Sequence, residues 1–181
     1  MRFTRRSGRL EARVEPVEAR LLSTMASDLL ELLGPGEDAG ADPLAAMVGL
    51  SSGPLHQPDD PALARLLPDA YEDDDEASAE FRRYTEGDLR AGKRARAGQV
   101  LASLAPYDEG GRVPLDREQA DAWLGLLNDL RLVLGIRLEV TEETDLDPPG
   151  DDPQAQALHV YGWLGEVQES LLAQLVRLPP A

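Results

Sequence analysis

The sequence predicts a mainly α-helical protein: a compact bundle of three to four long helices plus short ones, with a small β-hairpin at the N-terminus. Three observations predict this class. Apolar residues recur at spacings of three and four along four long segments. Proline and glycine mark the ends of those segments, and period-two alternation occurs in the first 15 residues. The chain has 181 residues, 42% of them hydrophobic, so a single domain over residues 1–181 can bury its own core.

The predicted hairpin occupies residues 1–15, with strands at 2–5 and 9–15 on either side of Ser7-Gly8. The second strand alternates, so that its apolar residues face one way and its charged residues face the other. The apolar set is Leu10, Ala12 and Val14. A two-stranded hairpin is marginally stable by itself, so we expect its apolar face to lie on the helices.

A first long helix begins at Pro16, where the missing amide proton costs no hydrogen bond, and it ends before Gly34. Its predicted core stripe is Val17, Leu21, Met25, Leu29, Leu32 and Leu33. Residues 34–60 are rich in Gly, Pro, Asp and Ser, and they predict a loop-rich segment with one short helix at 43–48. Asp60 then caps another short helix.

A second long helix is predicted over residues 77–104. Its expected inner side is Phe81, Tyr84, Asp88, Leu89, Ala91, Ala95 and Ala102, closed by Val100, Leu101 and Leu104. With those residues inside, the basic residues of this helix face outward: Arg82, Arg83, Arg90, Lys93, Arg94 and Arg96. They form either a surface that contacts a partner or an anion, or a face paired with acids of the same chain, such as Glu86 with Arg90. The net charge of −16 favours the second interpretation.

The strongest helical pattern lies at residues 116–138 and predicts the central helix. Asp116 and Gln119 have the spacing of a capping box, and we expect the helix to continue to about Glu143. Asp152 and Pro153 begin the last helix, the first as N-cap and the second at its first position. Its predicted buried stripe is Leu158, Tyr161, Leu164, Val167, Gln168, Leu171 and Leu175.

Three polar residues, Asn128, Asp129 and Arg131, lie within the apolar pattern of the central helix. One interpretation is an anion site or partner contact through Arg131. The other is a structural brace that holds this helix to the hairpin or to the last helix, and we favour it. No nucleophile or general base accompanies the three residues, so the sequence does not predict an enzyme.

Composition excludes several kinds of site. The chain has no cysteine and two histidines, His56 and His159, so neither a disulfide nor a thiolate or histidine-rich metal site is expected. No nucleotide-binding, hydrolase or metalloprotease motif occurs, and we expect no cofactor. The sequence has no run of 18 apolar residues and no signal peptide, so we expect a cytoplasmic protein without a membrane partner.

Four segments resemble an actinobacterial family defined only as a domain of unknown function, which includes the AosR-type oxidative-stress transcriptional regulators. They are RFTRR with GRLEARVEPVEARLL near the N-terminus, DDPALARLLPDAY at 59–71, WLGLLNDLRLVLGIRLEV at 123–140 and HVYGWLGEVQESLLAQL at 159–175. The resemblance implies a cytosolic regulator that acts through protein contacts, with an alternative sigma factor or RNA polymerase as partner. It also implies redox sensing through paired cysteines, and this sequence has none, so that switch does not transfer.

Two other functions remain open at this point. A direct DNA-binding regulator would use the basic residues 82–96 and the N-terminal arginines, which are Arg2, Arg5, Arg6, Arg9 and Arg13. The net charge argues against this, so DNA contact would be indirect or weak. A small-ligand or anion-binding protein would use Asn128, Asp129 and Arg131. A homodimer is also open.

Overall fold

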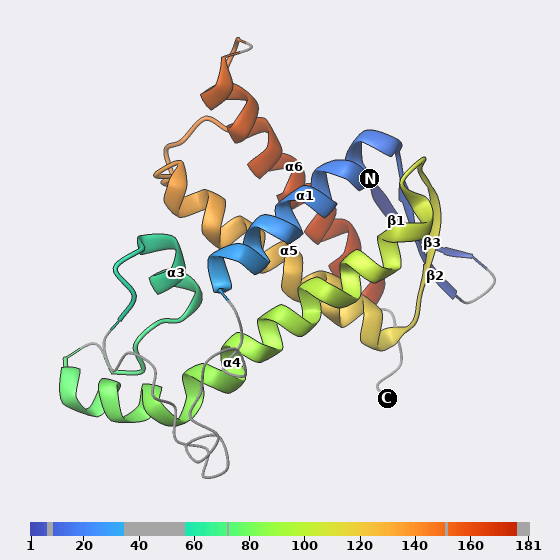
Figure 1. The fold of residues 1–181 in the computed structure, drawn as a ribbon. Coiled ribbons are helices and arrows are strands. Elements are labelled where there is room, and N and C mark those ends of the chain that lie inside the picture. The colour runs from blue at the N-terminus through green and yellow to red at the C-terminus, as the bar shows by residue number, and fades with distance from the viewer. Residues whose placement is uncertain (7–8, 35–56, 72, 151, 177–181) are drawn as a thin grey trace.

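The computed structural model describes residues 1–6, 9–34, 57–71, 73–150 and 152–176. These ranges form a small sheet and a set of helices around one core, which confirms the predicted class (Figure 1). The strands are β1 (Arg2–Arg6), β2 (Arg9–Val14) and β3 (Gly111–Leu115). The helices are α1 (Pro16–Leu33), α3 (Pro61–Leu66), α4 (Asp75–Leu104), the 3₁₀ turn η2 (Ala105–Tyr107), α5 (Arg117–Arg137) and α6 (Pro153–Leu175). The predicted short helix at 43–48 and the turn at residues 7–8 lie outside the described residues.

The sheet is antiparallel with strand order β1-β2-β3, so the expected N-terminal hairpin gains a third strand from the middle of the chain. Phe3, Ala12 and Val113 pair in one row across the three strands and are buried. The Phe3 ring packs edge to face on the Trp123 indole, with the ring centroids 5.8 Å apart. This row therefore packs the sheet against α5. The expectation that the hairpin lies on the helices is confirmed.

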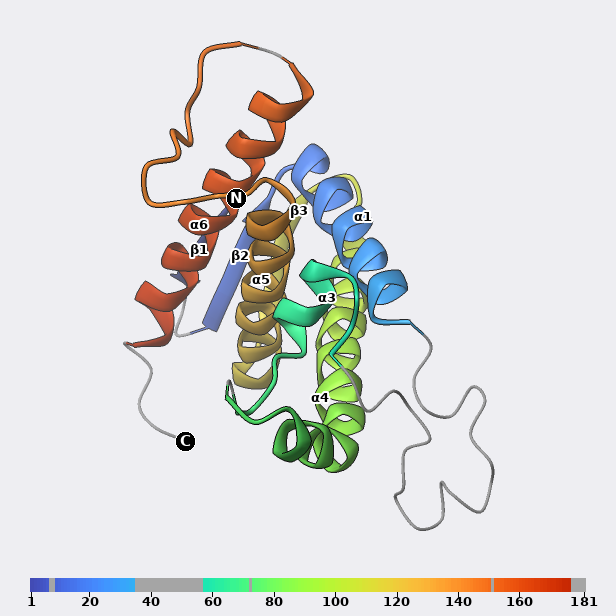
Figure 2. The ribbon, with the colours of Figure 1, turned by 90° about the vertical axis from the view of Figure 1, so that its left-hand side faces the viewer.

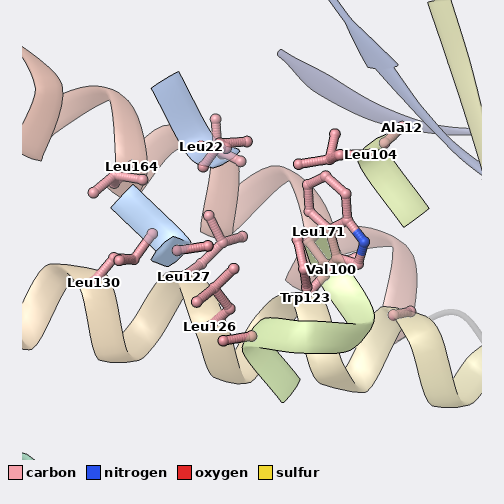
Figure 3. Close-up of a cluster of buried hydrophobic side chains, with 14 of the residues drawn as sticks. Ala12, Leu22, Val100, Leu104, Trp123, Leu126, Leu127, Leu130, Leu164 and Leu171 are labelled. Carbon is pink, nitrogen blue, oxygen red and sulfur yellow. The ribbon is translucent and has the colours of Figure 1, made fainter. Parts of the chain in front are cut away.

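Helix α5 is the centre of the fold. It packs against α4 on one side and α6 on the other, with α3 and α1 also in contact (Figure 2). Its N-cap Asp116 accepts from the Gln119 amide while the Gln119 side chain accepts from the Asp116 amide, as the capping-box spacing predicts. Figure 3 shows the core at its centre, where α5 meets residues from β2, α1, α4 and α6. The α5 contributors labelled there are Trp123, Leu126, Leu127 and Leu130.

The predicted core stripe of α1 is partly wrong. Val17 is 65% exposed, and the buried residues are Ala19, Leu22, Ala26, Leu29 and Leu33. The actual stripe contains two alanines, Ala19 and Ala26. The sequence prediction counts only large apolar residues and not alanine. The buried face that it predicts is therefore turned around the helix towards Val17.

The predicted inner face of α4 is wrong along most of the helix, although the closing residues Val100 and Leu104 are buried as expected. Phe81, Tyr84, Leu89, Ala91, Ala95 and Ala102 are all exposed. The buried residues are Ser78, Arg82, Lys93, Ala97, Val100 and Leu104. Arg82 and Lys93 face inward because each is paired there with carboxylates or backbone carbonyls. A cation that is paired in this way can be buried.

Helix α5 ends at Arg137, six residues before the predicted end at Glu143. Glu139 has a positive φ of 51°, and the Val140 amide bonds back to the Gly135 carbonyl at 2.9 Å. These bonds close the helix with a turn that reverses the chain. The last helix begins at Pro153, as predicted, with Asp152 accepting from the amides of Gln154 and Ala155. Among the described helices, none combines the length and apolar character that crossing a membrane requires.

Candidate functional site

The polar residues of α5 do not form one cluster. Asp129 is 2% exposed and faces α4, where its Oδ1 accepts from Lys93 Nζ at 2.6 Å. Its second oxygen lies 3.7 Å from Arg96 Nη2. Asn128 is exposed to solvent. Asp129 is therefore a brace between α5 and α4, and it makes no pair with its neighbour Arg131.

Arg131 faces α6 instead. Its Nη1 donates to Gln168 Oε1 at 2.8 Å, and its guanidinium lies over the Tyr161 ring at 5.2 Å from the centroid. Gly165 lies beside it, where a Cβ would make an ordinary van der Waals contact at 3.7 Å from the guanidinium carbon. Arg131 thus joins the central helix to the last helix.

The basic residues of α4 do not form one outward surface, which corrects the expectation that they all face outward. The favoured interpretation, pairing with acids of the same chain, holds for Arg82, Arg90 and Lys93. Arg82 and Lys93 are 5% and 7% exposed, and only Arg83 of the six is classed as exposed. Arg82 donates to Asp69 at 2.5 Å, to Glu86 at 2.7 Å and to the Leu67 carbonyl at 3.1 Å. Burial lowers the pKa of Arg82, but its bonds to Asp69 and Glu86 outweigh that effect, and the pKa lies above its ordinary value.

Two further arginines of α4 cap the end of α1. Arg94 donates to the carbonyls of Leu30 and Gly34, and Arg90 donates to the carbonyl of Leu33. Carbonyls at a helix C-terminus lack intrahelical partners and carry partial negative charge, so cations are favoured there. Arg90 also pairs with Glu86 at 2.6 Å, the i,i+4 pair that the spacing predicts.

A hollow of about 630 Å³ lies between the connector that precedes α6 and α6 itself. Arg131 lines it, but Asn128 and Asp129 do not, so the three predicted residues share no pocket. The carboxylates of Asp147, Glu166 and Glu169 line it as well. This surplus of negative charge does not favour an anion.

The outer side of α4 carries exposed apolar residues that sequence reasoning had placed inside. Phe81 and Tyr84 are 47% and 61% exposed, and Tyr71 meets the Phe81 ring edge to face at 6.2 Å. Leu89 is 41% exposed and borders the same depression as Phe81. We call Tyr71, Phe81, Tyr84 and Leu89 the α4 apolar patch. Tyr84 lies two residues after Arg82, on nearly the opposite side of the helix, so burial of Arg82 turns Tyr84 to solvent. Leu89, seven residues after Arg82, lies on the same side as Arg82, and the sequence carries no such signal for it.

The five N-terminal arginines, Arg2, Arg5, Arg6, Arg9 and Arg13, are all exposed on or beside the sheet. In the described part of the chain, no group of three or more histidine, aspartate or glutamate side chains is arranged to hold a metal ion. Two surfaces of the described residues remain as candidate sites: the α4 apolar patch and the sheet face that carries the exposed arginines.

A family model described as a domain of unknown function, DUF2017, matches residues 1–175. The chain belongs to the DUF2017 family. The match runs from β1 to the last residue of α6, so every element described above is part of the DUF2017 fold.

Among its relatives is a protein of Mycobacterium tuberculosis named oxidative stress regulator AosR, which is 34% identical over 187 residues. That match covers 96% of this chain and 85% of the relative. A protein of Mycobacterium leprae named putative oxidative stress regulator AosR is 34% identical over 182 residues, with 93% and 83% covered. The predicted resemblance is confirmed. No solved structure matches this DUF2017 chain significantly.

Proposed function

We propose that this protein is a cytoplasmic stress-response regulator that works by binding another protein of the transcription machinery, an alternative sigma factor or RNA polymerase. The observation that carries the proposal is the similarity to proteins named oxidative stress regulators, which extends over 96% of the chain. Without cysteine, the chain has no thiol switch of its own, and we propose that it acts as an adaptor.

The α4 apolar patch supports action through protein contact. Monomeric proteins seldom expose several large apolar side chains side by side, and aromatic residues supply much of the binding energy in protein interfaces. Tyr71, Phe81 and Tyr84 are each about half exposed or more. Their packing inside a partner would remove this apolar surface from water.

The DNA-binding alternative relied on two groups of basic residues, and the group on α4 no longer supports it. Arg82, Arg90, Lys93 and Arg94 bind carboxylates or carbonyls within the chain, so they are not free to neutralise phosphates. The ligand-binding alternative loses its composite site, since Asp129 faces α4 and Arg131 faces α6. Protein contact is the function that the arrangement supports best.

Affinity purification of the full chain from the cell that makes it, followed by mass spectrometry, tests this proposal. We expect a sigma factor or a polymerase subunit to be recovered. A Phe81→Ser/Tyr84→Ser variant should recover less, while a matched Val17→Ser/Leu172→Ser variant, which changes two exposed apolar residues elsewhere, should not. Recovery of neither a sigma factor nor a polymerase subunit by the unaltered chain would overturn the proposal.

A further inference from the structure

The outward face of the sheet carries three arginines in one row. Arg2 is the register partner of Arg13, and Arg13 is the register partner of Arg112. Residues directly opposite on antiparallel strands point to the same face, with Cα atoms about 4.5–5.5 Å apart. The adjacent row, which contains Phe3, is buried, so strand alternation turns the arginines to solvent. We call Arg2, Arg13 and Arg112 the arginine row.

More positive charge lies on the same face at the other end of the hairpin. Arg6 and Arg9 are register partners, and both are exposed. The acids beside the face are Glu11, 3.5 Å from Arg112, and Glu15, 3.8 Å from Arg13. In the described part of the sheet, five guanidinium groups therefore face two carboxylates.

This arrangement opposes stability. Like charges directly opposite each other on neighbouring strands repel and destabilise a sheet. The chain has 34 acidic and 18 basic residues. In its interior it pairs both Arg82 and Lys93 with carboxylates. On the sheet face, by contrast, five arginines share two carboxylates, so an excess of positive charge is left that suits an anion from outside the chain.

We propose that the outward face of the sheet binds an acidic segment of a protein partner. The guanidinium fork of arginine matches a carboxylate in a bidentate manner, and three forks in a row suit successive Asp or Glu side chains. The inference rests on the proposed function, because it assumes that the chain works by protein contact. It adds the chemistry of that contact and its place on β1, β2 and β3.

Three observations favour an acidic protein over nucleic acid. The net charge of −16 repels a nucleic acid, which carries a charge on every phosphate, more strongly than a short acidic segment. The middle row of the face is Thr4, Glu11 and Pro114, which offers no aromatic ring for base stacking. Glu11 also interrupts the positive surface where a continuous line of phosphates would pass. A second copy of the chain is not the partner of this face, because two arginine rows would lie against each other and repel.

The test uses the full-length chain and two fluorescein-labelled probes, a short peptide of alternating Glu and Ala and a short DNA duplex. The row variant is Arg2→Gln/Arg13→Gln/Arg112→Gln. The control variant is Arg20→Gln/Arg65→Gln/Arg83→Gln, which removes the same charge from three exposed positions elsewhere. We expect the row variant to bind the acidic peptide about tenfold more weakly than the unaltered chain, and the control variant to bind it normally.

Unfolding in urea gives a second readout. Because the row repels itself, the row variant should be at least as stable as the unaltered chain. Equal peptide binding by the two variants, sheet-dependent binding of DNA in preference to the peptide, or a row variant less stable than the control would each overturn the inference.

The proposed function is judged separately in the same material. If the unaltered chain recovers a sigma factor or polymerase subunit and the row variant recovers it equally well, the proposed function stands and the inference fails. If the unaltered chain recovers neither, the proposed function fails, while the peptide measurement still decides whether the sheet binds acidic segments.

Discussion

Lys93 on α4 and Asp129 on α5 form an ion pair across the middle of the fold, with Nζ and Oδ1 2.6 Å apart and the two side chains 9% and 3% exposed. A charge so well buried is tolerated only with its partner, because removing the partner leaves it without compensation for lost hydration. This pair holds the longest helix to the central one.

Asp129→Leu should lower the free energy of unfolding by about 3–5 kcal/mol, since it leaves the Lys93 ammonium buried and unpaired. Urea denaturation followed by circular dichroism measures the change. Asp121→Leu on the same helix is the control, because Asp121 pairs with Arg117 at the surface, and its loss should cost less than about 1 kcal/mol. The double variant Lys93→Met/Asp129→Leu should recover most of the stability. Equal costs for the two single changes would show that the pair is not a buried brace.

Gly125 of α5 lies under Arg96 of α4, and a Cβ at Gly125 would lie 2.5 Å from Arg96 Cδ. Gly125→Ala in an Arg96→Ala background should therefore raise the free energy of unfolding by about 1 kcal/mol, the usual gain of alanine over glycine in a helix. In the unaltered background the displaced arginine should cancel that gain, so the two changes are not additive. Gly98→Ala, which meets no neighbour within 4 Å, should give the same gain in both backgrounds.

Arg94→Ala should loosen the last turn of α1, because the Leu30 and Gly34 carbonyls lose their donor. We expect about 1–2 kcal/mol of lost stability and faster hydrogen exchange at the amides of Leu33 and Gly34. Exchange mass spectrometry on the α1 peptide measures it. Arg83→Ala, an exposed arginine of the same helix, should leave this exchange unchanged. Faster exchange with both variants would argue against the cap.

Asp60 gives α3 a dependence on pH. Backbone bonds from Leu63 and Ala62 and the pair with Arg137 hold the pKa of Asp60 below its ordinary value of 3.8. A carboxyl with a lowered pKa stabilises the fold above pH 3.8, and it loses that contribution as pH falls through the folded value. We expect Asp60→Asn to reduce the fall in stability between about pH 4 and pH 2, measured by urea unfolding at several pH values. An unchanged pH profile would show that Asp60 does not contribute.

The boundaries of most elements followed from local chemistry in the sequence. Pro16, Asp60, Asp116 and Pro153 each begin a helix through a cap or a proline, and such signals need no knowledge of the rest of the chain. The end of α5 did not follow, because a reversal at Glu139 with positive φ has no residue-level signal when the residue is not Gly or Asn.

Faces were harder to predict than boundaries. The inner face of α4 depends on Asp129, Asp69 and the last carbonyls of α1, which lie far away in sequence and reward burial of cations. The arginine row depends on the pairing of β2 with β3, which are separated by nearly a hundred residues. Hydrophobic periodicity contains neither kind of information, so the candidate surfaces emerged only from the tertiary structure.

The Phe3 amide donates to Ser170 Oγ at 3.0 Å, and α6 packs along β1. During synthesis on the ribosome, β1 leaves the exit tunnel before α6, so the sheet lacks one of its supports until α6 has been made. A nascent chain stalled before Pro153 would leave uncovered the part of β1 that α6 contacts and the α6-facing side of α5. Such an intermediate is a natural client for chaperones, and C-terminal truncations of this protein should accumulate as aggregates or be degraded instead of persisting as smaller folded domains.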